Sequence, residues 1–146
     1  MKVCMRTSFT IIALLTFSIC SWSQGQDILP YQKILGNWHG SSICVDKKTD
    51  PACKDEEVIY TVVPIDSIPN AVFFHAFKVI KGTPEPMGDF TLAYSDSVHF
   101  WSVEFSGRLR ARWSFQINDT LLNGTLREIP SERLIRQVVA SRYKSQ

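Results

Sequence analysis

Eight runs of alternating apolar and polar residues, rich in β-branched and aromatic side chains, fill most of the chain. A period of two residues is the spacing of a strand that turns one face toward a core. The runs cover residues 38–45, 57–65, 71–80, 89–94, 98–105, 109–117, 121–128 and 133–143. This repeated pattern predicts an all-β fold.

The connections between the runs are short and carry turn residues such as Pro69, Asp96 and Asn118. Short connections join antiparallel neighbours, because parallel strands need long crossovers. An open sheet of this size would expose two edges and a large apolar face, whereas a closed barrel has neither and encloses side chains or one small ligand. We therefore predict an eight-stranded antiparallel up-and-down barrel. The alternative, a two-sheet sandwich, would normally have longer crossing connections.

Local signals refine this outline. Asp27 can cap a short helix that ends near Leu35, with Pro30 in its first turn. Residues 82–88 contain two prolines and are expected to form a turn. We place the penultimate hairpin turn at 118–119, so that Gly124 is expected at a bulge or a close backbone approach.

The first 23 residues have the pattern of a signal peptide. Lys2 and Arg6 form a basic flank, residues 8–20 are an apolar core, and 21–23 supply small residues for cleavage after Ser23. The core is too short for a membrane span, and Ile19 is a poor fit beside Cys20 for lipid attachment. We expect a secreted or periplasmic protein with one domain over residues 24–146.

Charge gives no support for nucleic-acid binding. The chain has 16 Lys and Arg against 14 Asp and Glu, and two of the basic residues lie in the signal peptide. The remaining chain is therefore balanced. Residues 27–107 carry 6 basic and 11 acidic side chains, while 108–146 carry 8 and 3. One wall of the barrel should be basic.

Two of the four cysteines, Cys44 and Cys53, lie outside the signal peptide. An isolated pair in an exported chain predicts a disulfide that closes a short charged loop. A metal site is the competing interpretation, but two thiols without a nearby histidine are too few ligands.

A Gly-x-Trp at the first strand and an arginine at the last connect the two ends of the chain. In a closed meander the last strand pairs with the first, which brings Arg142 close to Trp38 and Gly36. A guanidinium over an indole ring contributes about 1–2 kcal/mol when it is desolvated. Arg136 is a less well placed alternative partner.

This combination of short helix, Gly-x-Trp and closing arginine resembles the lipocalin and wider calycin superfamily. The chain is shorter than full-length lipocalins and lacks their long C-terminal helix, so it looks more like the compact lipocalin-like domains of bacterial secreted proteins. The resemblance implies that a small hydrophobic molecule binds in the barrel mouth. It also implies that Gly36, Trp38 and Arg142 are structural residues.

Catalytic signals are weak. No histidine has a second ligand at metal-binding spacing, and neither a nucleophile elbow nor a phosphate loop is present. We expect a non-enzymatic protein without a cofactor.

Aromatic side chains recur with period two inside the runs, as expected either for an ordinary core or for a pocket wall. The residues predicted to line the lumen are Phe73, His75, Phe77, Trp101, Trp113 and Phe115, with His75 as the polar contact. Runs 71–80 and 98–105 are apolar on both faces, so an outer patch could meet a protein partner or a second copy.

Arg108, Arg110 and Arg112 alternate with apolar residues, and we expect them on the outer face. The inverted register would place three guanidinium groups in the lumen, which is costly without an anionic ligand.

A second function class is a barrel that recognises a partner through its surface. The chain resembles the periplasmic metalloprotease inhibitors in size, in its single disulfide and in the Gly-x-Trp start. Those proteins insert a free N-terminal segment into the protease cleft. Residues 24–27 would have that role here. The volume of the lumen distinguishes the two classes, since an empty apolar lumen favours carriage.

Overall fold

The computed structural model describes residues 29–143 except 108 and 119. The expected signal peptide, Asp27 and the segment 24–27 lie outside the described residues. Its elements are η1 (Pro30–Ile34), β1 (Gly36–Cys44), β2 (Glu56–Pro64), β3 (Ala71–Ile80), β4 (Thr83–Ser95), β5 (Phe100–Phe105), β6 (Ala111–Asn118), β7 (Leu121–Glu128) and β8 (Leu134–Arg142).

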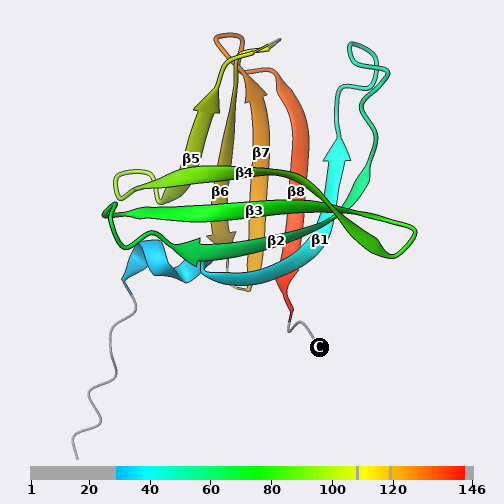
Figure 1. Cartoon of the computed structure of the whole chain (residues 1–146). Helices are drawn as coiled ribbons and strands as arrows, with labels where there is room; N and C mark the ends of the chain where they lie inside the picture. The colour runs from blue at the N-terminus through cyan, green and yellow to red at the C-terminus, as the bar shows by residue number, and fades with distance from the viewer. Residues whose placement is uncertain (1–28, 108, 119, 144–146) are drawn as a thin grey trace, which may run out of the picture.

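The eight strands form a closed antiparallel barrel in sequence order. β8 pairs with β1 and completes the closure. The predicted up-and-down barrel is confirmed, and the two-sheet sandwich is wrong. In Figure 1, β2, β3 and β4 cross the front of the barrel, while β5 to β8 stand upright behind them.

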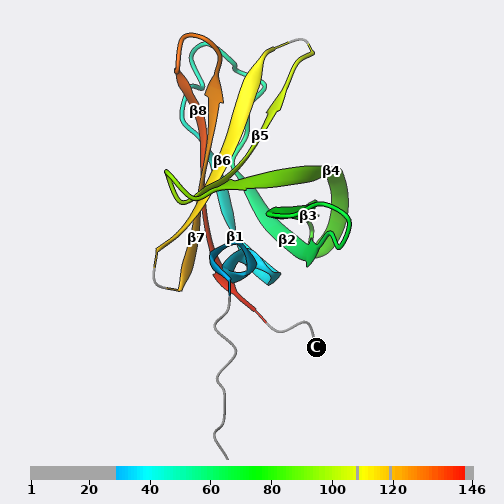
Figure 2. The same cartoon turned by 90° about the vertical axis from the view of Figure 1, so that its left-hand side faces the viewer.

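β4 and β5 are the most weakly joined neighbours. Only three residue pairs link them, from Ala93–Ser102 to Ser95–Phe100. The rest of β4 turns away with β3, and the upper parts of β5 to β8 rise beyond it (Figure 2). The barrel therefore opens on the side where these two strands diverge.

The other end of the barrel is closed by the residues that the sequence singles out. Trp38 is fully buried, and its Nε1 donates a hydrogen bond of 2.8 Å to the carbonyl of Ile34. Arg142 is the β8 register partner of Trp38, and its guanidinium carbon lies 4.4 Å from the indole centroid. The same guanidinium donates to the carbonyls of Leu35 and Lys33.

Gly36 allows this arrangement. Its φ of +114° is in the region that disfavours other residues, and a Cβ atom there would lie 2.9 Å from Nη1 of Arg142. The predicted contact between Trp38 and Arg142 is thus present, and it ties η1, β1 and β8 together.

The lead-in differs in detail from the prediction. It is a 3₁₀ helix of five residues with Pro30 in its first turn and no side-chain cap. Its carbonyls bond to Trp38, Arg142 and Trp101. Tertiary contacts therefore hold this short segment where helix propensity alone would not.

The predicted turn over residues 82–88 is wrong, because β4 already begins at Thr83. Pro84 and Pro86 pair with β3 on one side only, since β5 does not reach this part of β4. A proline fits a strand whose other edge is free. The register shifts between Ala76 and Phe77 of β3, which places a bulge in β4 beside Met87.

Gly124 occupies a close approach, as expected. A Cβ atom at this position of β7 would lie 2.6 Å from the Phe115 ring. The preceding hairpin joins Asn118 of β6 to Leu121 of β7, so the turn position predicted from sequence is also confirmed.

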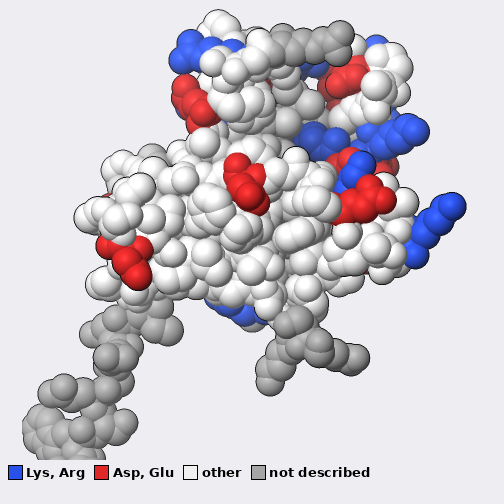
Figure 3. Space-filling view, in the orientation of Figure 1, with Lys and Arg blue, Asp and Glu red and all other residues white. Residues whose placement is uncertain are grey.

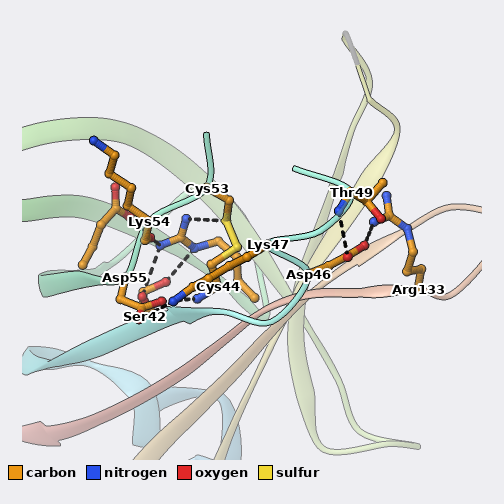
Figure 4. The surroundings of a disulfide bond; sticks show 11 residues. Ser42, Cys44, Asp46, Lys47, Thr49, Cys53, Lys54, Asp55 and Arg133 are labelled. Atoms are coloured by element: carbon orange, nitrogen blue, oxygen red, sulfur yellow. Dashed lines mark hydrogen bonds and ion pairs between the residues drawn. A yellow bond between two sulfur atoms is a disulfide. The ribbon is translucent and has the colours of Figure 1, made fainter. Parts of the chain in front are cut away.

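The disulfide between Cys44 and Cys53 is present and closes the loop after β1. Asp55 accepts hydrogen bonds from the backbone N–H of Cys44 and from Lys47, as Figure 4 shows. These contacts hold the base of the loop against the barrel rim.

Loss of the disulfide is expected to lower the free energy of unfolding by about 2–3 kcal/mol, because the bond restricts the unfolded chain over a sequence separation of 9. Denaturant unfolding of the oxidised protein and of a Cys44→Ser, Cys53→Ser double variant measures the difference. Identical unfolding midpoints would contradict this expectation.

Arg133 links the loop after β1 to the turn between β7 and β8. Its guanidinium donates to the carboxylates of Asp46 and Glu128. Figure 4 shows the contact with Asp46. The hydrogen bonds from Arg133 and Ser131 hold the pKa of Glu128 below its usual value. Desolvation raises the pKa of Asp46, but hydrogen bonds from Thr49 and Arg133 outweigh it and leave the pKa lowered.

These shifts give a pH dependence with a defined sign. A carboxyl group whose pKa is lower in the folded state contributes stability above its unfolded pKa, and that contribution is lost as the pH falls through the folded pKa. We expect the thermal midpoint of unfolding to decrease as the pH is lowered below about 4.5, which is the ordinary pKa of the Glu128 carboxyl group. An Asp46→Asn, Glu128→Gln variant should lose less stability over this range. An equally steep fall in that variant would assign the effect to other groups.

Candidate functional site

The lumen contains a cavity of about 190 Å³. Its walls come from β1, β2, β3, β4, β6 and β8. The lining residues are Ser42, Glu56, Tyr60, Phe74, Ala76, Met87, Phe90, Trp113, Phe115 and Arg136. Aromatic and aliphatic side chains form most of this wall, and the polar groups gather at one place.

Closely packed aromatic rings form the floor of the cavity. The rings of Tyr60 and Phe74 lie 4.7 Å apart, and the Phe74 and Phe115 rings are separated by the same distance. Trp113 stacks on Phe115 at 5.5 Å between ring centroids. Tyr60, Phe74 and Phe115 are buried, while Trp113 is half-buried. The floor is therefore part of the buried core, and Trp113 is its half-buried continuation.

Arg136 supplies the polar end. Strand alternation on β8 turns it inward with Val138 and Ala140, and only 14% of its side chain is exposed. Its Nε donates to the hydroxyl of Ser42 at 2.9 Å, and Nη2 lies 2.7 Å from the Glu56 carboxylate. The carbonyls of Ser42 and Lys54 also accept from Nη2. A cation inside an apolar barrel is tolerated because it is paired and hydrogen-bonded.

One donor nitrogen of Arg136 is less occupied. Nη1 contacts only the sulfur of Cys53, at 3.4 Å, among the described residues. Sulfur is a weak acceptor. Nη1 therefore keeps donor capacity, and Arg136 is one of the residues that line the cavity.

Tyr60 places a hydroxyl beside the same polar end. Burial raises the pKa of Tyr60 far above its usual range, and the nearby Arg136 only partly opposes this shift. The hydroxyl is thus protonated at every physiological pH. It forms no hydrogen bond to another residue within 29–143 as described, so it too can serve an incoming polar group.

The cavity reaches solvent on the side where β4 leaves β5. Met87, at the bulge of β4, is 41% exposed, and Phe90 and Trp113 are half-buried beside the opening. Met is flexible and tolerates changes in packing. This end is opposite Trp38, which closes the other end of the barrel.

The residues predicted to line the lumen lie in three different places. Trp113 and Phe115 line the cavity. Trp101 points inward but lies at the closed end, where its Nε1 donates to the carbonyl of Tyr31 at 3.1 Å and its ring packs on Tyr94. It belongs to the core below the cavity.

The placement of Phe73, His75 and Phe77 in the lumen is wrong, because they lie on the outer face of β3. Their neighbours Val72, Phe74 and Ala76 form the inner face. His75 bonds to Asp89 at 2.9 Å and packs edge-on against Phe73. Both residue sets of β3 are apolar, so the alternation could not distinguish the two faces.

The polar end of the cavity was not predicted. Arg136 was expected only as an alternative partner of Trp38, and no binding role was predicted for Glu56 or Ser42. The spacing of these residues contains the signal, because side chains an even number of positions apart share one face of a strand. Ser42 therefore points inward with Trp38 on β1, and Arg136 points inward with Arg142 on β8.

The outer surface matches other expectations. Arg112 lies on the outer face and bonds to Glu132, and Arg110 pairs with Glu104 at the surface. The outer register is therefore confirmed for these two arginines, whereas Arg108 lies outside the described residues. Figure 3 shows that the face of β2 to β4 is largely uncharged.

The described residues contain no group of three or more side chains arranged to hold a metal ion. None of their helices has the length and apolar character of a membrane span. The chain matches none of the protein-family models, and a search of curated proteins finds no match to it.

Proposed function

We propose that this protein is a secreted, non-enzymatic, lipocalin-like carrier whose lumen binds a small molecule with an apolar body and one polar end. The observation that supports this function is the combination of an aromatic cavity with the donors of Arg136 and Tyr60 at one end. Ligand sites typically pair an apolar wall with a few fixed polar groups.

The cavity volume limits the ligand. A cavity of about 150 Å³ lined by apolar side chains holds benzene, and this lumen is about 190 Å³. The ligand is therefore of the size of a single substituted ring or a short chain. A long-chain fatty acid exceeds the cavity.

The polar end defines the second requirement. Because Glu56 already balances the charge of Arg136, the site does not need an anion. A carbonyl, hydroxyl or carboxyl oxygen can accept from Nη1 of Arg136 and from the Tyr60 hydroxyl. Such bonds orient the ligand with its apolar part toward Trp113 and Met87.

Titration with cyclohexanol and with cyclohexanecarboxylic acid tests this proposal, since neither probe absorbs where tryptophan does. We expect a saturable change in tryptophan emission, because Trp113 lines the cavity. Ala76→Leu adds three methyl-sized carbons inside the cavity and should abolish the change. Ala93→Leu adds the same group at an exposed position of β4 and is the matched control.

Thermal unfolding of both variants separates loss of binding from loss of folding. Overpacking at Ala76 is expected to cost about 1–3 kcal/mol, which lowers the midpoint without removing the folded baseline. Absence of a saturable response in the parent protein would contradict the proposal. An unchanged response in Ala76→Leu would place the probe elsewhere.

A surface-recognition function is the second candidate, supported by the outer face of β2 and β3. Ile59, Val63, Phe73 and Phe77 are apolar and point away from the lumen. They belong to β2 and β3, whose outer face is largely uncharged in Figure 3. A Phe73→Ser, Phe77→Ser variant that keeps lumen binding but changes the sedimentation of the protein would support this second function.

A further inference from the structure

The outer face of β5, β6 and β7 carries a second, larger cavity of about 480 Å³. It is a groove on the other side of the sheet from the lumen. Val98 and Phe100 border it at the start of β5, and Glu132 in the β7–β8 turn borders it at the other end. The residues between them are Ser102, Arg112, Ser114, Gln116, Asn123, Thr125 and Arg127.

The groove floor consists of cross-strand rows of polar side chains. Gln116 pairs with Asn123, and Ser114 lies between Ser102 and Thr125 in register. All five are half-buried. On this face, only the arginines form side-chain hydrogen bonds to described residues. The amides and hydroxyls of the floor are therefore available to a ligand.

The two arginines of the floor have different environments. Arg112 lies 2.5 Å from the Glu132 carboxylate and 3.6 Å from Glu104, so its charge is balanced. Arg127 donates to the backbone carbonyl of Glu132 at 2.8 Å and has no carboxylate partner among the described residues. The groove therefore holds one oriented guanidinium whose charge is not neutralised.

These groups match the chemistry of a sugar. Amides and hydroxyls both donate and accept, as the hydroxyl groups of a sugar ring require. Phe100 offers an apolar ring face on which the C–H side of a sugar can pack. A guanidinium binds a carboxylate through two parallel hydrogen bonds. The floor from Arg112 to Gln116 extends over about 13 Å of strand, which suits a short oligomer.

Two other ligand classes fit less well. A peptide strand adds to a sheet through free backbone groups, but here β6 is paired with β5 and β7 on both sides. A nucleic-acid backbone needs several cations, whereas this groove has one unbalanced arginine and the carboxylate of Glu132.

We propose that this groove binds a short acidic oligosaccharide, with a uronic acid carboxylate on Arg127 and ring hydroxyls on Gln116, Asn123 and the hydroxyl row. The site is independent of the lumen, because Ser114 and its outward neighbours lie on the opposite face of β6 from Trp113 and Phe115.

Isothermal titration with trimers of galacturonate, guluronate and glucuronate tests the proposal, and their methyl esters serve as matched neutral ligands. At least one trimer should bind saturably, about tenfold or more tightly than its ester, because the ester loses the charged partner of Arg127. Arg127→Gln should remove this preference. Gln116→Ala should weaken both forms by about threefold to tenfold.

Arg110→Gln is the control for the arginine, because Arg110 is an exposed surface residue outside the groove lining. An unchanged circular dichroism spectrum, together with an unchanged thermal midpoint, shows that each variant is folded. The proposal is overturned if no trimer binds, if acid and ester bind equally, or if Arg110→Gln weakens binding as much as Arg127→Gln. None of these results bears on ligand binding in the lumen.

Discussion

Replacing Trp38 with alanine is expected to lower the free energy of unfolding by about 3–5 kcal/mol, the usual cost of removing a large aromatic side chain from a core. The indole is fully buried at the closed end, and η1 packs over it. Its loss leaves a void and removes the hydrogen bond to Ile34. Equilibrium denaturation by urea measures the change.

Arg142→Ala should cost less and should be coupled to Trp38→Ala. The two side chains are in contact, with 4.4 Å between the guanidinium carbon and the ring centroid. The non-additive part of a double-mutant cycle is expected to be about 1 kcal/mol. Strict additivity would mean that the contact contributes nothing, and the closed end would then depend on packing alone.

Gly40→Ala is the second change with a large expected effect, about 3 kcal/mol or more. A Cβ atom at Gly40 would lie 2.0 Å from the carbonyl oxygen of Val139 and 2.5 Å from Cα of Ala140. Both are backbone atoms of β8, so the clash cannot be relieved by a side-chain rotation. β1 and β8 must move apart at the seam that closes the barrel, and overpacking of this kind is at the upper end of its usual cost.

Gly107→Ala is the control, because a Cβ atom there meets nothing within 4 Å. Urea denaturation of both variants compares them directly. Equal stability of Gly40→Ala and Gly107→Ala would show that β1 and β8 are not held at the spacing described here.

Most of the fold could be predicted, because it depends on local patterns along each strand and on one contact between the first and the last strand. Period-two runs and short turns define antiparallel strands, and the Trp38–Arg142 pair indicates how the sheet closes. The start of β4 could not be predicted in this way. Pro84 and Pro86 argue for a turn unless one knows that this part of β4 lacks a second neighbour.

The site was harder to predict because β3 is apolar on both faces. The inner face takes Phe74 and the small Ala76, since the rings of Tyr60 and Phe115 already occupy part of the lumen. Which face of β3 turns inward depends on the combined volume of side chains from several strands. The sequence of a single strand does not contain this information. Arg136 could have been found from its spacing to Arg142, but a charged residue inside a barrel is unexpected without its partners Glu56 and Ser42.

Nuclear Overhauser contacts between protein and bound cyclohexanecarboxylic acid test the central claim most directly. We predict contacts from the ring protons of the probe to Phe74, Ala76 and Trp113, which face the cavity, and none to Phe73 or Phe77, which face outward. Contacts to Phe73 or Phe77 without any to Ala76 would place the ligand on the outer face of β3. That result would contradict the assignment of the lumen as the binding site.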